Sequence, residues 1–364
     1  MQSETQRILK HRDFWTGKPL ATPLVSIRVG DVFISRQFRA NSQLLKKNHL
    51  VKLEDLQVDK YLNDYEEMYQ THEKVAQDGF FVGEPINGFP WMEAICGCDI
   101  LGSESSFVSK RQFDCLDDLE KIEYSQENPW YLKYLEFLEG IDRVSAGRFP
   151  LGQPILRGVS DTLGALVGQE EMVCGLMIDP DKMSRLFGEV VRLHRSLIAD
   201  SYRIIKPWKG GYSFGFYYVW APGRTIWFQE DLAAIMAPHH FNQFLKTTAT
   251  EICKDYNYSM QHLHPASFGH LEGILSLPFL SAVQINREDV GPSVAEILPQ
   301  LNSVINAGKK LIILGVLDDN DIESIAANLP HHSIALHAMV PTIDAGNALS
   351  ERIAERCAAH GWHS

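Results

Sequence analysis

Two histidines stand one residue apart in the stretch SMQHLHP, residues 259–265, at what reads as the end of a buried strand. In a strand, a residue and its second neighbour share one face, so His262 and His264 are expected to point the same way. Two imidazoles on one face can bind one metal ion. A chance pairing is the alternative, because the chain contains 14 histidines.

Further candidate ligands end other apolar runs. His337 ends HSIALH, and Asp161 ends QPILRGVSD. If these runs are neighbouring strands, His262, His264 and His337 supply three ligands to one zinc ion and leave the fourth position open for substrate, as in catalytic zinc sites. Asp231 is the candidate for proton handling or for a fourth ligand, with helix capping as the alternative.

The elements that must position these residues alternate from about residue 150 onward. Short apolar runs follow helix-like stretches, and the clearest runs are YSMQHLH, FLSAVQI, KKLIILGV and HSIALH. GGYSFGFYYVWAPG is expected as one aromatic strand and GFFVG as a further strand. Such alternation predicts a parallel sheet, and the number of units favours an α/β fold of the (β/α)8 TIM-barrel class. We expect a helical extension over residues 1–75 and the barrel over residues 76–364.

Composition narrows the classes of partner. The net charge of −12 disfavours binding to nucleic acid or to anionic lipid, and no apolar run is long enough for a membrane span. The polar N-terminus and six scattered cysteines favour a cytoplasmic protein with reduced thiols. Cys96 and Cys98 form one close pair, for which packing is favoured over metal binding.

The order of several weaker motifs resembles the uroporphyrinogen decarboxylase superfamily, and within it the corrinoid-dependent methyltransferases of the methylcobalamin:coenzyme M type. The motifs are RFPLGQPILRGVSDTLGALVGQEEMVCGLMIDPDKMSRLF, WFQEDLAAIMAPHHFNQFL, MQHLHPASFGHLEGILSLPFLSAVQI, GKKLIILGV and, earlier, GFPWMEAICGCDI. The resemblance implies a barrel whose zinc is held by a His-x-Cys and by a later Cys ten residues before an Asn. His262 matches the family His, His264 stands in place of the first Cys, and His337, ten residues before Asn347, in place of the second.

Replacement of both thiolates by imidazole predicts a harder metal centre that prefers oxygen to sulfur. We therefore expect a zinc methyltransferase that moves a methyl group between a small methoxy compound and a corrinoid carried by a partner protein. The alternatives are a metal-free decarboxylase, for which Arg36 and Arg39 offer few cations, and a non-catalytic barrel that binds a corrinoid or tetrapyrrole. A homodimer is left open. The side chains expected to contact substrate are Tyr212, Tyr217, Trp220, Trp227 and Asp161, with core packing as the alternative for the aromatic ones.

Overall fold

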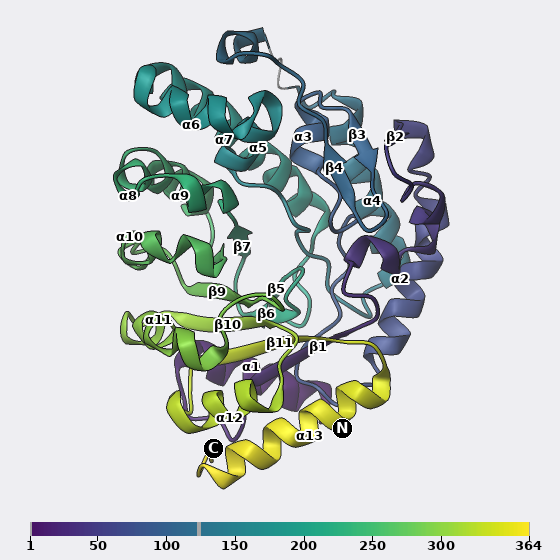
Figure 1. Ribbon diagram of the computed structural model, residues 1–364. Coiled ribbons are helices and arrows are strands. Elements are labelled where there is room, and N and C mark those ends of the chain that lie inside the picture. The colour runs from purple at the N-terminus through teal and green to yellow at the C-terminus, as the bar shows by residue number, and fades with distance from the viewer. Residues whose placement is uncertain (1, 122–124, 364) are drawn as a thin grey trace.

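The computed structural model describes residues 2–121 and 125–363, and its central element is a curled sheet of six parallel strands (Figure 1). The strand order is β1-β11-β10-β9-β8-β7, and every neighbouring pair is parallel. The strands are β1 (Leu24–Val29), β7 (Thr225–Phe228), β8 (Tyr258–Leu263), β9 (Ala282–Arg287), β10 (Lys310–Gly315) and β11 (Ile334–Val340). The four runs predicted as strands after residue 255 are confirmed as β8 to β11.

Burial of both faces explains why these strands read as continuous apolar runs. Val283, Ile285, Leu311 and Ile313 point outward into the main core, whereas Ile312 belongs to a separate cluster inside the curve of the sheet. Helices follow strands β7 to β11 and cover the outer face of the sheet (Figure 1). They are α8 (Pro238–His240), α9 (Lys246–Cys253), α10 (Leu271–Leu275), α11 (Val294–Asn306), α12 (Asp319–Asn328) and α13 (Ile343–Ala359).

Strand β1 corrects the expectation that residues 1–75 form only a helical extension. It pairs with β11 from Leu24 to Val29, so this segment contributes a strand to the sheet. Its inward side chains include Ser26 and Arg28, which interrupt the apolar run of the strand. Between β1 and β7 run two extended segments, residues 79–84 and 150–156, joined by a parallel bridge between Gly83 and Leu151.

The aromatic stretch from residue 211 is an antiparallel hairpin and not the single strand expected. Its strands are β5 (Tyr212–Phe214) and β6 (Val219–Ala221), and its turn includes Tyr218 with φ of 59°. Phe214 and Val219 pack with Trp227 and Met260 inside the curved sheet. Gly215 permits this insertion, because a Cβ there would lie 2.0 Å from the carbonyl oxygen of Gln153.

The remaining helices and strands pack around the curved sheet. Helix α1 (Glu4–Thr16) contacts β6 and contributes Phe14 to the interior cluster. A small antiparallel sheet, in the order β2-β3-β4, lies on the opposite side of the molecule from α10 and α11 (Figure 1). These elements are β2 (His49–Val51), α2 (Asp59–His72), α3 (Trp91–Ile95), β3 (Ile100–Gly102), β4 (Phe107–Ser109), α4 (Pro129–Ser145), α5 (Val159–Val167), α6 (Gln169–Ile178) and α7 (Pro180–Ile204). Among the described residues, no helix has the length and apolar character that a bilayer crossing requires.

Candidate metal centre

Asp231, His262 and His264 bring three potential metal-ligating atoms together at the carboxyl ends of two neighbouring strands. Asp231 follows β7, His262 is the penultimate residue of β8, and His264 is the first residue after β8. Asp231 Oδ1 lies 3.7 Å from His262 Nε2 and 3.8 Å from His264 Nε2. All three ligand atoms lie within 4.8 Å of one another. Ligands of one tetrahedral zinc, bound at about 2.0–2.1 Å, lie roughly 3.4 Å apart, so the two distances from Asp231 are close to those of a bound geometry.

Hydrogen bonds on the far side of each imidazole fix its orientation. His262 Nδ1 contacts Gln284 Oε1, and His264 Nδ1 lies 2.5 Å from Glu288 Oε1. Because both partners are acceptors, each Nδ1 carries the proton and each Nε2 keeps a lone pair directed toward Asp231. Metal-binding histidines are usually held in this way. Burial lowers the pKa of His262 to about 4, so this imidazole is neutral and ready to bind a cation at neutral pH.

The partners of the histidines come from β9 and the residue after it, and the motifs around the histidines do not predict them. Gln284, Asn286 and Glu288 follow one another at every second position, which is the spacing that singled out the histidine pair. His262 pairs with Gln284 across the two strands. Gln284 Nε2 donates to Asn286 Oδ1 at 3.0 Å, which fixes the amide with its oxygen toward His262. Polar residues at every second position of the strand after the histidines are the sequence pattern that indicates these partners.

Two buried carboxylates fasten the loop that carries Asp231 to the start of α5. Asp161 accepts hydrogen bonds from the backbone N–H groups of Asp231 and Leu232, at 3.1 and 2.7 Å. Glu230 accepts from Val159 N and Ser160 N in return, at 3.0 and 2.9 Å. Burial raises the pKa of Asp161, and burial together with Asp161 raises that of Glu230 to about 8. Asp161 therefore lies in the first turn of α5, not at a strand end as expected, and acts on Asp231 through the backbone.

The structure does not place His337 with the other two histidines. It is fully buried inside the curved sheet, where its Nδ1 lies 2.8 Å from Ser26 Oγ. The rings of Tyr217 and Tyr218 pack against it, with centroids 6.1 and 5.4 Å away. The spacing before Asn347 is correct, but His337 is an interior residue of β11 and the group of potential ligands contains Asp231 in its place.

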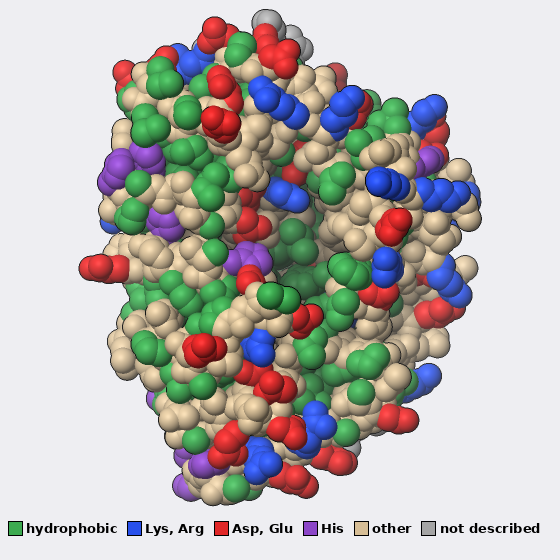
Figure 2. Space-filling view, in the orientation of Figure 1, with side chains coloured by type: hydrophobic (Ala, Val, Ile, Leu, Met, Phe, Trp, Pro, Cys, Tyr) green, Lys and Arg blue, Asp and Glu red, His purple; other side chains and the backbone are tan. Residues whose placement is uncertain are grey.

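A cavity of about 280 Å³ opens beside Asp231 and the two histidines. Figure 2 shows the hollow near the centre of this face, with hydrophobic side chains inside it and histidine and acidic side chains at its edge. Strand β4 and the segment before α3 contribute to its wall. The apolar lining residues are Phe89, Pro90, Phe107, Ile155, Phe216, Tyr217, Trp227 and Leu314, and the polar ones include Ser106, Arg157, Gln229 and Asn286.

The four aromatic residues expected to contact substrate divide into two pairs. Tyr217 and Trp227 line the cavity, and the Tyr217 hydroxyl donates to Gln284 Oε1 at 2.9 Å. Tyr212 packs on Tyr202 with ring centroids 5.5 Å apart, and Trp220 is buried with Phe80 and Trp208. Tyr212 and Trp220 therefore belong to the core and are not among the lining residues, because only the turn of the hairpin faces the cavity.

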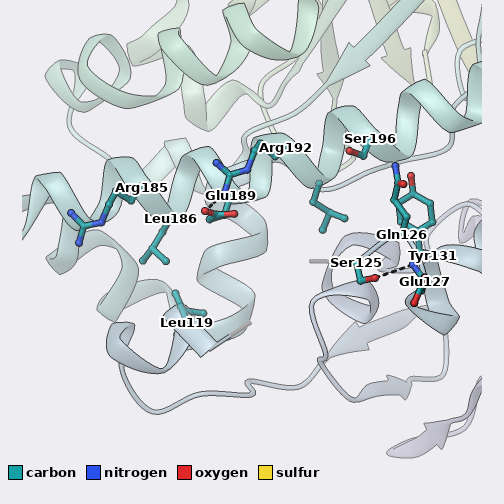
Figure 3. Close-up of a pocket in the computed structure, with 11 residues that line it drawn as sticks. Leu119, Ser125, Gln126, Glu127, Tyr131, Arg185, Leu186, Glu189, Arg192 and Ser196 are labelled. Carbon is teal, nitrogen blue, oxygen red and sulfur yellow. Dashed lines mark hydrogen bonds and ion pairs between the residues drawn. The ribbon is translucent and has the colours of Figure 1, made fainter. Parts of the chain in front are cut away.

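A larger groove of about 820 Å³ lies between α7 and the segment before α4 (Figure 3). Its walls carry Arg192 and Glu189, which form an ion pair on one face of the helix, and the side chain of Tyr131. Among the described residues, the one group of three potential metal-ligating side chains is at the strand ends and not in this groove. The candidate site is therefore the smaller cavity.

Comparison with known proteins places the fold but not the family. No family model matches the sequence, and neither does any curated protein. Among solved structures, a methyltransferase from Methanosarcina mazei has a similar fold, with a TM-score of 0.62 and 13% identity. The alignment covers 98% of this chain and 99% of that chain. The two proteins therefore share an architecture over their whole length.

Proposed function

We propose that this protein is a zinc-dependent methyltransferase that moves a methyl group between a small methoxy compound and a corrinoid carried by a partner protein. The observation that carries the proposal is the convergence of His262 Nε2, His264 Nε2 and Asp231 Oδ1 beside an aromatic cavity. The full-length likeness to a methyltransferase fold supports it. We further propose that residues 79–84 and 150–156 complete a (β/α)8 barrel of uroporphyrinogen decarboxylase type.

The types of metal-ligating side chain favour an oxygen substrate over a sulfur substrate. Two imidazoles and a carboxylate form a hard set without thiolate, which suits an oxygen ligand better than a thiol. Zinc, when bound there, would supply Lewis acidity toward the ether oxygen and make it a better leaving group. Asp231, expected to handle protons or to be a fourth ligand, is proposed as a ligand beside the two imidazoles, in the place expected for His337.

The protein's own residues perform the orienting work. Gln284 and Glu288 hold the two imidazoles, and Asp161 holds the loop of Asp231. Tyr217 and Trp227 form the apolar wall of the cavity. A substrate held there is shielded from water while its methyl group faces the mouth. A corrinoid on a separate protein would approach this open side.

The test is the visible spectrum of cob(I)alamin, free or bound to a corrinoid protein, as it becomes methylcobalamin. Metal content is measured first, with zinc and iron distinguished, and the zinc-loaded protein is then mixed with methoxyaromatics, methanol and methylated thiols. We expect methylation from methoxy compounds, its loss in His264→Ala, and little reaction with thiol donors. Reaction with thiol donors alone would reverse the assignment. Release of CO2 from a carboxylated compound by metal-free protein would favour a decarboxylase, and an inert protein that binds cobalamin would favour a binding barrel.

A further inference from the structure

Arg157 is the one Lys or Arg among the described residues that line the cavity. It lies on the extended segment before α5, and 44% of its side chain is exposed. Its Nε lies 3.2 Å from Glu93 Oε1. No other ion pair or hydrogen bond of this guanidinium is present in the described part of the chain. The edge formed by its two terminal nitrogens therefore remains available to a ligand.

Glu93 makes Arg157 a fixed cation. Its side chain is fully buried in α3, and the shortest contact of its carboxylate with the guanidinium is with Nε. A guanidinium held on one edge presents the opposite edge as a planar fork that matches a carboxylate in two parallel hydrogen bonds. Burial raises the pKa of Glu93 to about 7, so this partner only partly offsets the charge of Arg157 near neutral pH.

The rest of the cavity limits the size and polarity of the ligand. Five Phe, Tyr and Trp side chains contribute to the wall, and a volume of about 280 Å³ suits one substituted aromatic ring rather than a macrocycle. The protein has a net charge of −12 and the site itself holds acidic side chains, so the surrounding field does not attract anions. An anionic ligand would need a dedicated cation, and Arg157 is placed to provide it.

We propose that the substrate is a single-ring aromatic methyl ether that carries a carboxylate, with the carboxylate bound by the terminal nitrogens of Arg157 and the ether oxygen directed toward the two Nε2 atoms. The methyl-transfer part of this inference rests on the proposed function. Recognition of the carboxylate by Arg157 does not, because it can be measured by binding alone.

The experiment compares two probes of equal size, 3-methoxybenzoate and 3-methoxybenzyl alcohol, by calorimetric titration of the protein with and without added zinc. We expect the benzoate to bind at least about 10-fold more tightly. Arg157→Gln should reduce this preference to about one-fold without changing alcohol binding, and Arg157→Lys should keep only part of it because an ammonium cannot form the bidentate pair. Arg111→Gln is the matched control, since Arg111 lines a neighbouring cavity but not this one.

A carboxylate that bound the metal instead of Arg157 would keep its preference in Arg157→Gln and lose it in His264→Ala, and this result would overturn the inference. Equal binding of both probes by the unaltered protein would overturn it as well. A carboxylate preference that depends on Arg157, without any methylation of cobalamin, would leave the inference standing and reject the methyltransferase. Methylation of cobalamin by the benzoate and the alcohol at equal rates, with both rates unaffected by Arg157→Gln, would do the reverse.

Discussion

Asp161 holds Asp231 by its backbone: the Asp161 carboxylate accepts the N–H groups of Asp231 and of the next residue, Leu232, at 3.1 and 2.7 Å. The same carboxylate also accepts Gly158 N at 3.2 Å. A buried side chain on α5 thus fixes the position of a potential metal ligand on a different loop.

Asp161→Asn should weaken both the fold and the metal site. An amide has one acceptor oxygen in place of two and turns an NH2 group toward backbone donors, which costs about 1–3 kcal/mol of unfolding free energy. The shift of Asp231 should also lower zinc affinity, measured by competition with a chelator. Asp78→Asn is the control, because Asp78 accepts Val25 N at 2.8 Å on a different loop. It should destabilise the fold similarly and leave zinc affinity unchanged; equal losses of affinity would reduce Asp161 to a structural residue.

His264→Ala should remove stoichiometric zinc, from about one ion per chain to less than about 0.1, because it deletes one of three protein ligands. The fold should remain, since His264 is one-third exposed beyond the end of β8. His337→Gln should retain the metal, because His337 contacts Ser26 and aromatic rings and not the ligand group. Elemental analysis of both purified variants decides between the two ligand sets. Loss of zinc in His337→Gln with retention in His264→Ala would restore the prediction made from sequence.

Glu288→Gln should lower zinc affinity by about 10- to 100-fold. The carboxylate of Glu288 orients His264 and increases the basicity of its Nε2, and loss of such a partner typically has this effect. The readout is the dissociation constant for zinc in a chelator competition. Glu272→Gln, an exposed change on α10, should have no effect. An unchanged affinity in Glu288→Gln would show that His264 is not a ligand or does not depend on this contact.

The protein should lose stability as the pH falls below about 6.5. Burial lowers the pKa of His194 on α7 to about 4, from an ordinary value of 6.5. Between these values the unfolded chain binds a proton that the folded protein does not, so the free energy of unfolding falls with falling pH, by about 3 kcal/mol for this one group. His194→Leu should flatten the profile between pH 6.5 and 4, as followed by urea unfolding at each pH. A profile as steep as that of the unaltered protein would assign the effect to other buried histidines, such as His11.

The sequence predicted those parts of the fold whose pattern is local. Strands β8 to β11 are apolar runs between helices, and the shared face of His262 and His264 follows from the period of a strand alone. The order of the strands around the sheet is not local. The pairing of β1 with β11 joins residues more than 300 positions apart, so the sequence of residues 1–75 alone predicts a helical extension.

The misplaced site residues have the same origin. His337 satisfies the spacing of the family motif, but its position along β11 is set by pairing with Ser26 in β1, which no local pattern reveals. Asp161 comes after an apolar run, as a residue at a strand end would, but Asp161 itself lies in the first turn of α5. Arg157 and Glu93 are 64 residues apart in the chain, and only the packing of α3 against the segment before α5 brings them together.

The inserted hairpin separates two tasks that a single strand would combine. The potential metal ligands lie on the strands of the sheet or directly after them. Phe216 and Tyr217, in the cavity wall, belong instead to the turn of a hairpin that packs inside the curved sheet. Substitutions in that turn can reshape the wall while the ligand-bearing strands keep their register, provided that Gly215 is retained. The ligand selectivity of the cavity can therefore diverge among descendants of this chain faster than the group of potential metal ligands, and directed evolution of new ligand specificity should begin at the hairpin tip.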